Sequence, residues 1–179
     1  MAPLRPALRL LVGALQGVPL PARILEAWRI VPDEGPSTQP LDPSRSRRYT
    51  GRWHNPRTTL ALYTALGWDT ALREYTHRRR HPFPAIAVKL RMMINHVFDL
   101  TDPDVASRLP FALARCLEDT DWSRLRGSVV GDAAVSLGAG ALLAPCVHGP
   151  DRCACLYMVH QSDFSIAELD RARIQEDVR

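Results

Sequence analysis

Six short apolar segments with the composition of β-strands recur along the chain, and they constrain the fold more than any other feature. Val, Ile, Leu, Trp and Tyr are concentrated in them. They lie at residues 26–31, 60–64, 85–92, 96–100, 141–145 and 153–159. Helix signals separate several of them, because Pro103 suits a first helical position and Gly138 suits the C-cap of a helix ending near 138. The alternation predicts a mixed α+β sheet core with flanking helices.

Length and charge limit the organisation and the partners. The chain has 179 residues, of which 46% are hydrophobic, which is enough for one core and too little for two ordinary domains. The net charge is only +4, so a nucleic-acid partner is permitted but not required. No stretch approaches the roughly 20 apolar residues of a membrane span, so no membrane partner is expected.

Both ends of the chain carry helix signals. Leu8, Leu11, Val12 and Leu15 recur at helical spacing, which favours an N-terminal helical extension over residues 1–23. The same region weakly resembles a secretory signal, but its apolar run is too short. Ser165 and Glu168 have the spacing of a capping box, which predicts a helical tail over 161–179.

Residues 32–75 combine a long polar loop with a further helix. The segment 32–50 is rich in Pro, Ser, Asp and Arg and predicts a loop at which a substrate enters. Asp69 is the expected cap of a helix that carries Glu74 and Tyr75 and ends in the basic run 77–81.

The four cysteines lack the framework of a small secreted disulfide protein, so a reducing cytoplasm is expected. Cys116, Cys153 and Cys155 are expected in the core. Two other interpretations concern Cys146. One is a zinc site with His148, Cys153, Cys155 and His160, and the other is a thiolate activated by His148. The zinc site lacks a C-x-x-C knuckle, so no metal is expected. The activated thiolate lacks a third group that would orient His148.

The segment from Thr50 to Tyr75 carries chemistry at regular spacing. Arg52, Tyr63 and Glu74 lie eleven residues apart on a loop edge, a strand and a helix. A guanidinium grips phosphate, a tyrosine offers a ring and a hydroxyl, and a carboxylate steadies a developing cation. Spacing alone favours the simpler interpretation, in which these are a surface arginine, a half-buried tyrosine and a solvated glutamate.

Several motifs in order, spanning about 24–160, resemble the RES domain family. They are "AWRIV", "GRWHNP", "LALYTA", "ALREY" and the late "GALLAPCVHGPDRCACLYM". The resemblance implies a fold related to ADP-ribosyltransferases and an activity that consumes NAD as substrate, without a cofactor. Known members are mostly toxins that break the bond between nicotinamide and ribose by hydrolysis or phosphorolysis, and an antitoxin with a Xre-type helix-turn-helix domain neutralises them.

The resemblance also assigns roles to residues. The family's two arginines match Arg29 and Arg52, its tyrosine matches Tyr63, and its glutamate matches Glu74 as the group that stabilises an oxocarbenium-like ribosyl cation. The late serine of the family is replaced here by Cys146, a poorer hydrogen-bond donor. The loop after Arg52 also lacks the usual glycine. The substrate-binding set is therefore Arg29, Arg52, Tyr63 and Cys146, with Glu74, Arg52 and Tyr63 as catalytic candidates.

Two alternatives to NAD degradation remain open. One is transfer of ADP-ribose to a macromolecule, and another is a degenerate RES fold that binds protein or nucleic acid without catalysis. The basic segments 44–53 and 77–81 favour nucleic acid, but no helix-turn-helix or RNP motif accompanies them, and a solvated helix end explains the second. Nucleic acid is therefore expected only indirectly, through the antitoxin, and homo-oligomer formation is left open.

Overall fold

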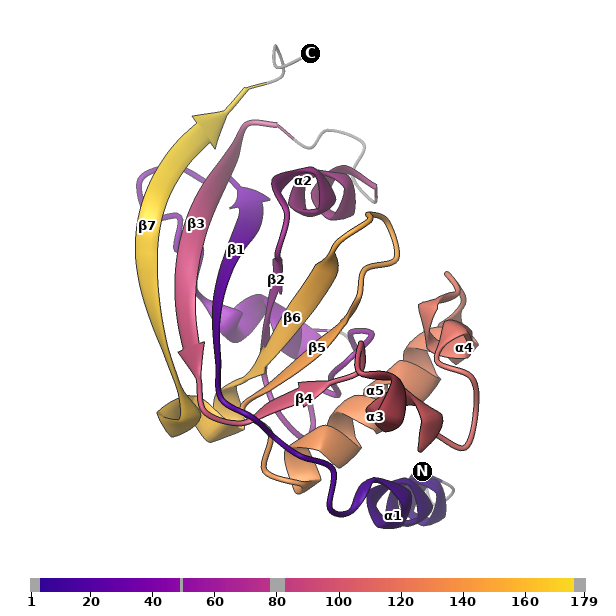
Figure 1. The fold of residues 1–179 in the computed structure, drawn as a ribbon. Coiled ribbons are helices and arrows are strands. Elements are labelled where there is room, and N and C mark those ends of the chain that lie inside the picture. Colours follow the sequence, from indigo (N-terminus) through magenta and orange to yellow (C-terminus); the bar gives the residue numbers. More distant parts are fainter. Residues whose placement is uncertain (1–3, 49, 78–82, 176–179) are drawn as a thin grey trace.

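The computed structural model describes residues 4–48, 50–77 and 83–175. Within them, seven strands form one sheet in the order β4-β5-β6-β2-β1-β3-β7, in which only β4 and β5 are parallel neighbours (Figure 1). The strands are β1 (Arg23–Pro32), β2 (Ala61–Ala65), β3 (Ala85–Ile94), β4 (Val97–Asp99), β5 (Ala141–Pro145), β6 (Arg152–Tyr157) and β7 (Phe164–Ile174). The α-helices are α1 (Leu4–Leu15), α2 (Trp68–Thr76), α3 (Pro103–Ser107), α4 (Ala114–Leu117) and α5 (Asp121–Ser136). Two 3-10 helices are η1 (Pro43–Arg48) and η2 (Met158–Asp163).

The sheet bends into two halves that pack against each other. Strands β1 and β2 pair only at Trp28↔Ala65, whereas β1 and β3 pair along ten residues. Figure 1 shows the long strands β1, β3 and β7 running at an angle to β4, β5 and β6. Val88, Leu90 and Met92 of the first half share a fully buried apolar cluster with Leu143 and Leu156 of the second. The single β1–β2 pair is therefore where the sheet folds over.

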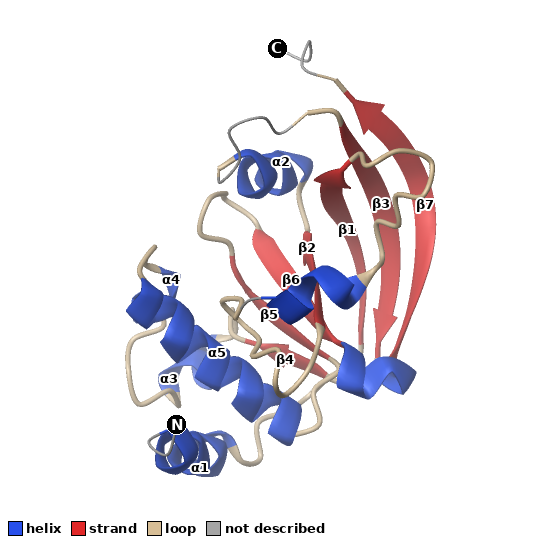
Figure 2. Ribbon diagram, turned by 180° about the vertical axis from the view of Figure 1, so that it is seen from behind, coloured by secondary structure: helices blue, strands red, loops and turns tan. Residues whose placement is uncertain are grey.

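Helices α1, α3, α4 and α5 cover the other face of the β2-β6-β5-β4 half. Figure 2 shows α5 lying across this part of the molecule with α1 beside it. Leu11 and Leu15 of α1 are 2% and 0% exposed, and they share one core with Phe98, Leu142 and Tyr157 of the sheet. The N-terminal helix predicted from the sequence is confirmed, and it belongs to the main core.

Most of the predicted elements are present, and two predictions at element ends are wrong. All six predicted strands occur, as does the helix ending near Gly138, which has a positive φ of 87°. The helix predicted after Ser165 is instead the edge strand β7, which pairs with β3 over its whole length. Asp69 lies in the first turn of α2, whose N-cap is Gly67 without a side-chain hydrogen bond.

Two further regions differ from the expectation or fall outside it. The polar loop 32–50 contains η1, so it is not entirely irregular. Residues 78–81 of the basic run and 176–179 of the predicted tail lie outside the described residues. Among the described helices, none has the length and apolar character needed to cross a membrane.

Candidate active site

A cavity of about 350 Å³ opens where β1 and β2 diverge beyond their single pair. Its walls come from β1, β2, α2, the segment 45–53 and the turn that follows β5. The five residues singled out by the sequence all line it: Arg29, Arg52, Tyr63, Glu74 and Cys146. These residues come from five separate segments, so the fold brings together what the sequence spreads over more than a hundred positions. Their chemical roles stay predictions.

Arg29 spans the gap between the two halves of the sheet. Its Nη1 donates to the carbonyl oxygen of Tyr63 on β2 at 2.6 Å, and its Nε donates to the carbonyl oxygen of Pro40 at 2.5 Å. Tyr63 lies two residues before the only residue of β2 that pairs with β1. The guanidinium therefore joins β1 to β2 where strand pairing has ended, and it keeps its positive charge at the cavity wall.

Arg52 is held by its backbone and by its side chain. A Cβ atom built on Gly127 or Gly131 of α5 would overlap the carbonyl oxygen of Arg52 or Trp53, respectively, so both positions require glycine for this close approach. The guanidinium Nη1 donates to the carbonyl oxygens of Cys116 and Glu118, the latter at 2.9 Å. The Arg52 side chain is only 11% exposed and is thus fixed against the C-terminal end of α4.

Tyr63 presents its ring to the cavity while its hydroxyl is engaged in the protein. The hydroxyl oxygen accepts from the backbone N–H of Trp53 at 3.0 Å and lies 2.9 Å from Nδ1 of His54. His54 is fully buried, and its Nε2 lies 3.0 Å from the carbonyl oxygen of Ser46. Because a carbonyl can only accept, Nε2 carries the proton, and Nδ1 accepts from the Tyr63 hydroxyl.

Burial sets the protonation of both partners in this pair. It lowers the pKa of the His54 imidazole below its ordinary value and raises the pKa of the Tyr63 hydroxyl well above its own. Both groups are therefore neutral near pH 7. Sequence reasoning missed His54, and the Gly-Arg-Trp-His run contains no signal that this imidazole meets Tyr63 nine residues later.

Glu74 lies on the buried side of α2, together with Thr70, Ala71 and Tyr75. Its Oε1 accepts from the backbone N–H groups of Val147 and His148 at 3.2 and 3.3 Å. Both amides belong to the turn between β5 and β6. The same turn is tied to α2 by Thr70, whose Oγ1 donates to Asp151 at 2.9 Å. The carboxylate is therefore held in one orientation at the cavity wall.

Cys146 and Cys153 form a disulfide bond, which the sequence analysis did not anticipate. The expectation that Cys153 is an ordinary core thiol is wrong, because Cys153 is half-buried and bonded. Cys116 and Cys155 are buried free thiols, as expected, and burial raises the pKa of Cys116 to about 11. In the disulfide form, Cys146 has no S–H donor, so it cannot replace the hydroxyl of a serine.

The arrangement of these side chains does not support the Cys146–His148 nucleophile pair or the zinc set that joins Cys146 to His148, Cys155 and His160. The His148 ring stacks on His77 with centroids 3.6 Å apart, while the Cys146 sulfur is bonded to Cys153. A Cys146–His148 nucleophile pair is therefore absent from this structure. The zinc set drawn from the sequence is also dispersed, because Cys155 lies in the helix-covered core and His160 Nε2 bonds the carbonyl oxygen of Val135 at 3.0 Å.

Two groups of side chains among the described residues have metal-binding donors close together. One is Glu74, Cys146 and Cys153, and the other is His77, Asp119 and His148; within each group the donor atoms lie within 4.8 Å of one another. In the second group the stacked imidazoles are only 20° from parallel. Their in-plane lone pairs then run side by side instead of meeting at one ion, and none of the three residues lines the cavity.

Comparison with known families identifies the fold. The RES domain profile matches residues 26–176, which is most of the chain. The chain belongs to the RES domain family. Its match extends over the residues of β7. Among curated proteins, none matches the sequence.

A solved structure shares the architecture of this RES domain. The MbcT toxin in the crystal structure of the M. tuberculosis MbcT–MbcA toxin–antitoxin complex superimposes with a TM-score of 0.75. The match has 17% sequence identity and covers 93% of this chain and 92% of the other. This similarity shows that the two chains share a fold.

Proposed function

We propose that this RES domain cleaves the bond between nicotinamide and ribose in NAD and acts as a toxin that an antitoxin neutralises. The observation that carries the proposal is the convergence of Arg29, Arg52, Tyr63, Glu74 and Cys146 on one cavity of about 350 Å³. That volume is in the range of small-molecule sites. The residue types match the parts of NAD, since the pyrophosphate is anionic, the nicotinamide is an aromatic cation and the ribose becomes cationic during cleavage.

Glu74 is the group that we assign to the ribosyl cation. Cleavage passes through an oxocarbenium-like state, and a carboxylate placed in advance beside the ribose lowers its free energy. The two amides that bond Oε1 hold the carboxylate without help from the substrate. Preorganisation of this kind is effective because no reorientation is needed as charge develops.

The two arginines supply binding and orientation. Both guanidiniums use some N–H groups on backbone carbonyls, and both keep their charge beside the cavity. They attract the pyrophosphate, so that binding energy from this remote part of NAD is used to orient the reacting bond. The hydroxyl of Tyr63 is engaged with Trp53 and His54, so Tyr63 acts through its ring, which packs against the nicotinamide or ribose.

The reaction needs no metal and no general acid at the leaving group. The C–N bond breaks with its electron pair going to the positively charged ring, so nicotinamide departs neutral. Water or phosphate then attacks the ribosyl carbon. Attack by water gives ADP-ribose and releases a proton, whereas attack by phosphate gives ADP-ribose that carries a phosphate on this carbon. Membership of the RES domain family supports the proposal that an antitoxin binds this chain. So does the solved structure with the same fold, which is a toxin–antitoxin complex.

Incubation of the purified chain with NAD, with and without phosphate, tests the activity. We expect release of free nicotinamide, measured by chromatography, with product identity showing which acceptor is used. Glu74→Gln should lower turnover by roughly 10²-fold or more with little change in NAD binding, because it removes one preorganised charge. Glu168→Gln on the distant edge strand β7 is the matched control and should leave turnover unchanged. If neither the reduced nor the oxidised chain releases nicotinamide from NAD, the proposal is overturned.

A further inference from the structure

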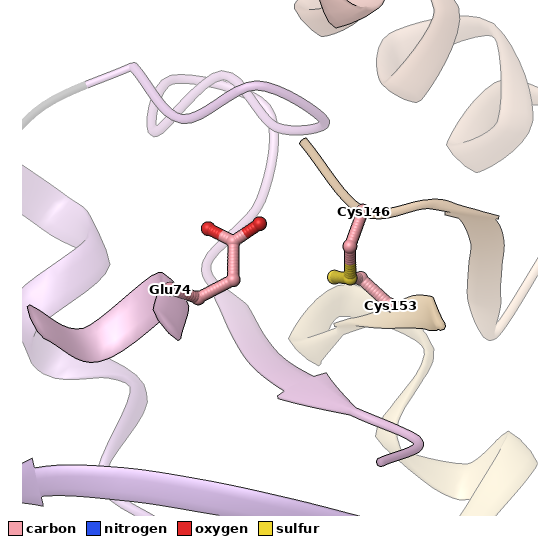
Figure 3. Close-up of side chains that lie close together, drawn as sticks. All are labelled: Glu74, Cys146 and Cys153. Carbon is pink, nitrogen blue, oxygen red and sulfur yellow. A yellow bond between two sulfur atoms is a disulfide. The ribbon is translucent and has the colours of Figure 1, made fainter. Parts of the chain in front are cut away.

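Glu74, Cys146 and Cys153 form a compact group in the wall of the cavity. Figure 3 shows the Glu74 side chain leaving α2 on the side that faces the Cys146–Cys153 disulfide. The carboxylate oxygen and both sulfur atoms lie within 4.8 Å of one another, and all three side chains are half-buried. A disulfide requires only the two sulfur atoms, so the nearby carboxylate adds a third potential metal ligand.

The hairpin of β5 and β6 fixes the separation of the two cysteines. Ala144 pairs with Cys153, and the backbone N–H of Cys146 donates to the carbonyl oxygen of Asp151 at 3.1 Å. The two Cα atoms are thereby held 5.4 Å apart. Two thiolates on one zinc ion, each about 2.3 Å from it, lie roughly 3.8 Å apart in a tetrahedron. This backbone separation allows that arrangement once the sulfurs are no longer bonded to each other.

Glu74 is also arranged to act as a ligand. Both of its amide hydrogen bonds go to Oε1, and Oε2 makes neither of them. The carboxylate is thus fixed by the same turn that carries Cys146. Arg29 and Arg52 line the same cavity and offset the negative charge that two thiolates and a carboxylate bring together.

We propose that reduction of the Cys146–Cys153 disulfide creates a Zn²⁺ site made of both thiolates and the Glu74 carboxylate. Reduction adds two electrons and two protons, and a phosphine reductant supplies them by taking the oxygen of one water molecule to become a phosphine oxide. Binding of Zn²⁺ then releases both thiol protons. Three protein ligands leave a fourth position for water, as in open zinc sites. The oxidised chain holds no such site, because its sulfurs are bonded to each other.

The site has a consequence that rests on the proposed function. Zinc bound to Glu74 neutralises the carboxylate that is assigned to the ribosyl cation. Zinc therefore inhibits NAD cleavage by the reduced chain, and the oxidised chain is insensitive to it. The ion is an inhibitor here and takes no part in the reaction.

Zinc content is the direct test, and it does not depend on any activity. The chain is reduced with a phosphine, freed of reductant, dialysed against micromolar Zn²⁺ and analysed by elemental mass spectrometry. We expect one Zn²⁺ per reduced chain and none per oxidised chain of identical sequence. Cys153→Ser should weaken zinc binding by at least about 100-fold, since losing a ligand exceeds the loss from an outer-shell partner. Cys116→Ala, which removes a buried thiol away from the site, should retain the ion.

Several outcomes would overturn the site. They are equal zinc in the reduced and oxidised chains, retention of zinc by a folded Cys153→Ser variant, and absence of zinc from the reduced chain. If Cys153→Ser does not fold, as judged by circular dichroism, the zinc contents of the reduced and oxidised unmutated chains still test the proposed site. A nicotinamide assay then separates the two proposals. Zinc that binds without inhibiting leaves the site standing and removes the role assigned to Glu74.

Discussion

At the residue scale, the hydrogen bonds of Tyr63 restrict what this side chain can do. Its hydroxyl accepts from Trp53 N–H and faces His54 Nδ1, so both of its hydrogen-bonding functions are used inside the protein. Burial also raises the pKa of this hydroxyl, which makes the phenolate less accessible. A role for Tyr63 as an acid or base is therefore disfavoured, and we expect it to act through the packing of its ring against the substrate.

Replacement of Tyr63 separates the hydroxyl from the ring. Tyr63→Phe leaves the Trp53 N–H and a buried imidazole nitrogen without a partner, so the free energy of unfolding should fall by about 1–3 kcal/mol. NAD turnover by the folded variant should change less than about tenfold, whereas Tyr63→Ala should lose much more because the ring is gone. Urea denaturation and the nicotinamide assay measure the two effects. A folded Tyr63→Phe variant that is as inactive as Tyr63→Ala would restore a chemical role for the hydroxyl.

The buried His54 gives the fold a dependence on pH with a definite sign. Its folded pKa lies below the ordinary value of 6.5, so between these two values the unfolded chain binds more protons. The stabilisation is complete above about pH 6.5 and is lost as the pH falls through the folded pKa. One proton limits the slope to about 1.4 kcal/mol per pH unit.

Urea denaturation between pH 7.5 and 5.0 should therefore show a steeper loss of stability in the unmutated chain than in His54→Gln. The glutamine variant is less stable at pH 7.5 but lacks this titration. The difference between the two slopes isolates His54 from the other histidines. Equal slopes would show that His54 is protonated in the folded chain as readily as in the unfolded one.

At the scale of elements, α5 positions the site through contacts that need the absence of a side chain. Gly127 and Gly131 lie one turn apart and receive the backbone of Arg52 and Trp53. Helix propensity alone would favour alanine at both positions. The backbone contact outweighs it, because a methyl group on Gly131 would overlap the Trp53 carbonyl oxygen, which also accepts from the Tyr157 hydroxyl at 3.1 Å.

Two glycine-to-alanine substitutions should accordingly change the free energy of unfolding in opposite directions. Gly131→Ala should lower the free energy of unfolding by about 1–3 kcal/mol, the range of overpacked cores, and reduce NAD binding by displacing Arg52. Gly13→Ala in α1 has nothing within 4 Å of the new methyl group, so it should raise stability by about 0.5–1 kcal/mol. Thermal or urea unfolding of both variants measures this. A neutral Gly131→Ala would mean that the segment 51–53 shifts without loss.

The sequence predicted those elements whose local pattern and tertiary pairing agree. The core strands carry buried Leu, Val and Ala side chains, and α5 ends at Gly138 as its pattern indicates. Strand β7 is the exception, because it is an exposed edge strand with almost no buried side chains to give it strand periodicity. The spacing of Ser165 and Glu168 therefore dominated the prediction, while the pairing with β3 that decides the structure leaves no mark in the local sequence.

The site divides in a similar way. Arg29, Arg52, Tyr63, Glu74 and Cys146 were found through ordered motifs, and the cavity brings all five together. The disulfide and the His54–Tyr63 contact were missed, since they follow from the register of β5 on β6 and from the path of the segment 46–54. Neither register nor loop path is encoded in residue spacing.

At the scale of the whole molecule, the two halves of the sheet depend on few direct connections beside the cavity. Strands β1 and β2 share a single residue pair, and the bonds of Arg29 to Tyr63 and Pro40 lie directly beyond it. A buried apolar cluster also joins the halves, and the Arg29 hydrogen bonds link β1 to β2 beside the site. We therefore expect Arg29, which is assigned to substrate binding, also to determine the width of its own cavity.

Arg29→Lys tests this double role, since lysine keeps the charge but cannot hold two carbonyl oxygens in a fixed fork. We expect the free energy of unfolding to fall by about 1.5–3 kcal/mol, the range for hydrogen bonds that involve a charged group, and NAD binding to weaken as well. Arg91→Lys is the matched control on the neighbouring strand β3. Its partner Glu26 is exposed, so this change should leave stability without a resolvable difference. Urea denaturation of both variants, followed by NAD titration, provides the measurements. If Arg29→Lys weakened NAD binding with no loss of stability, Arg29 would serve the substrate alone, and the width of the cavity would be set by the apolar cluster.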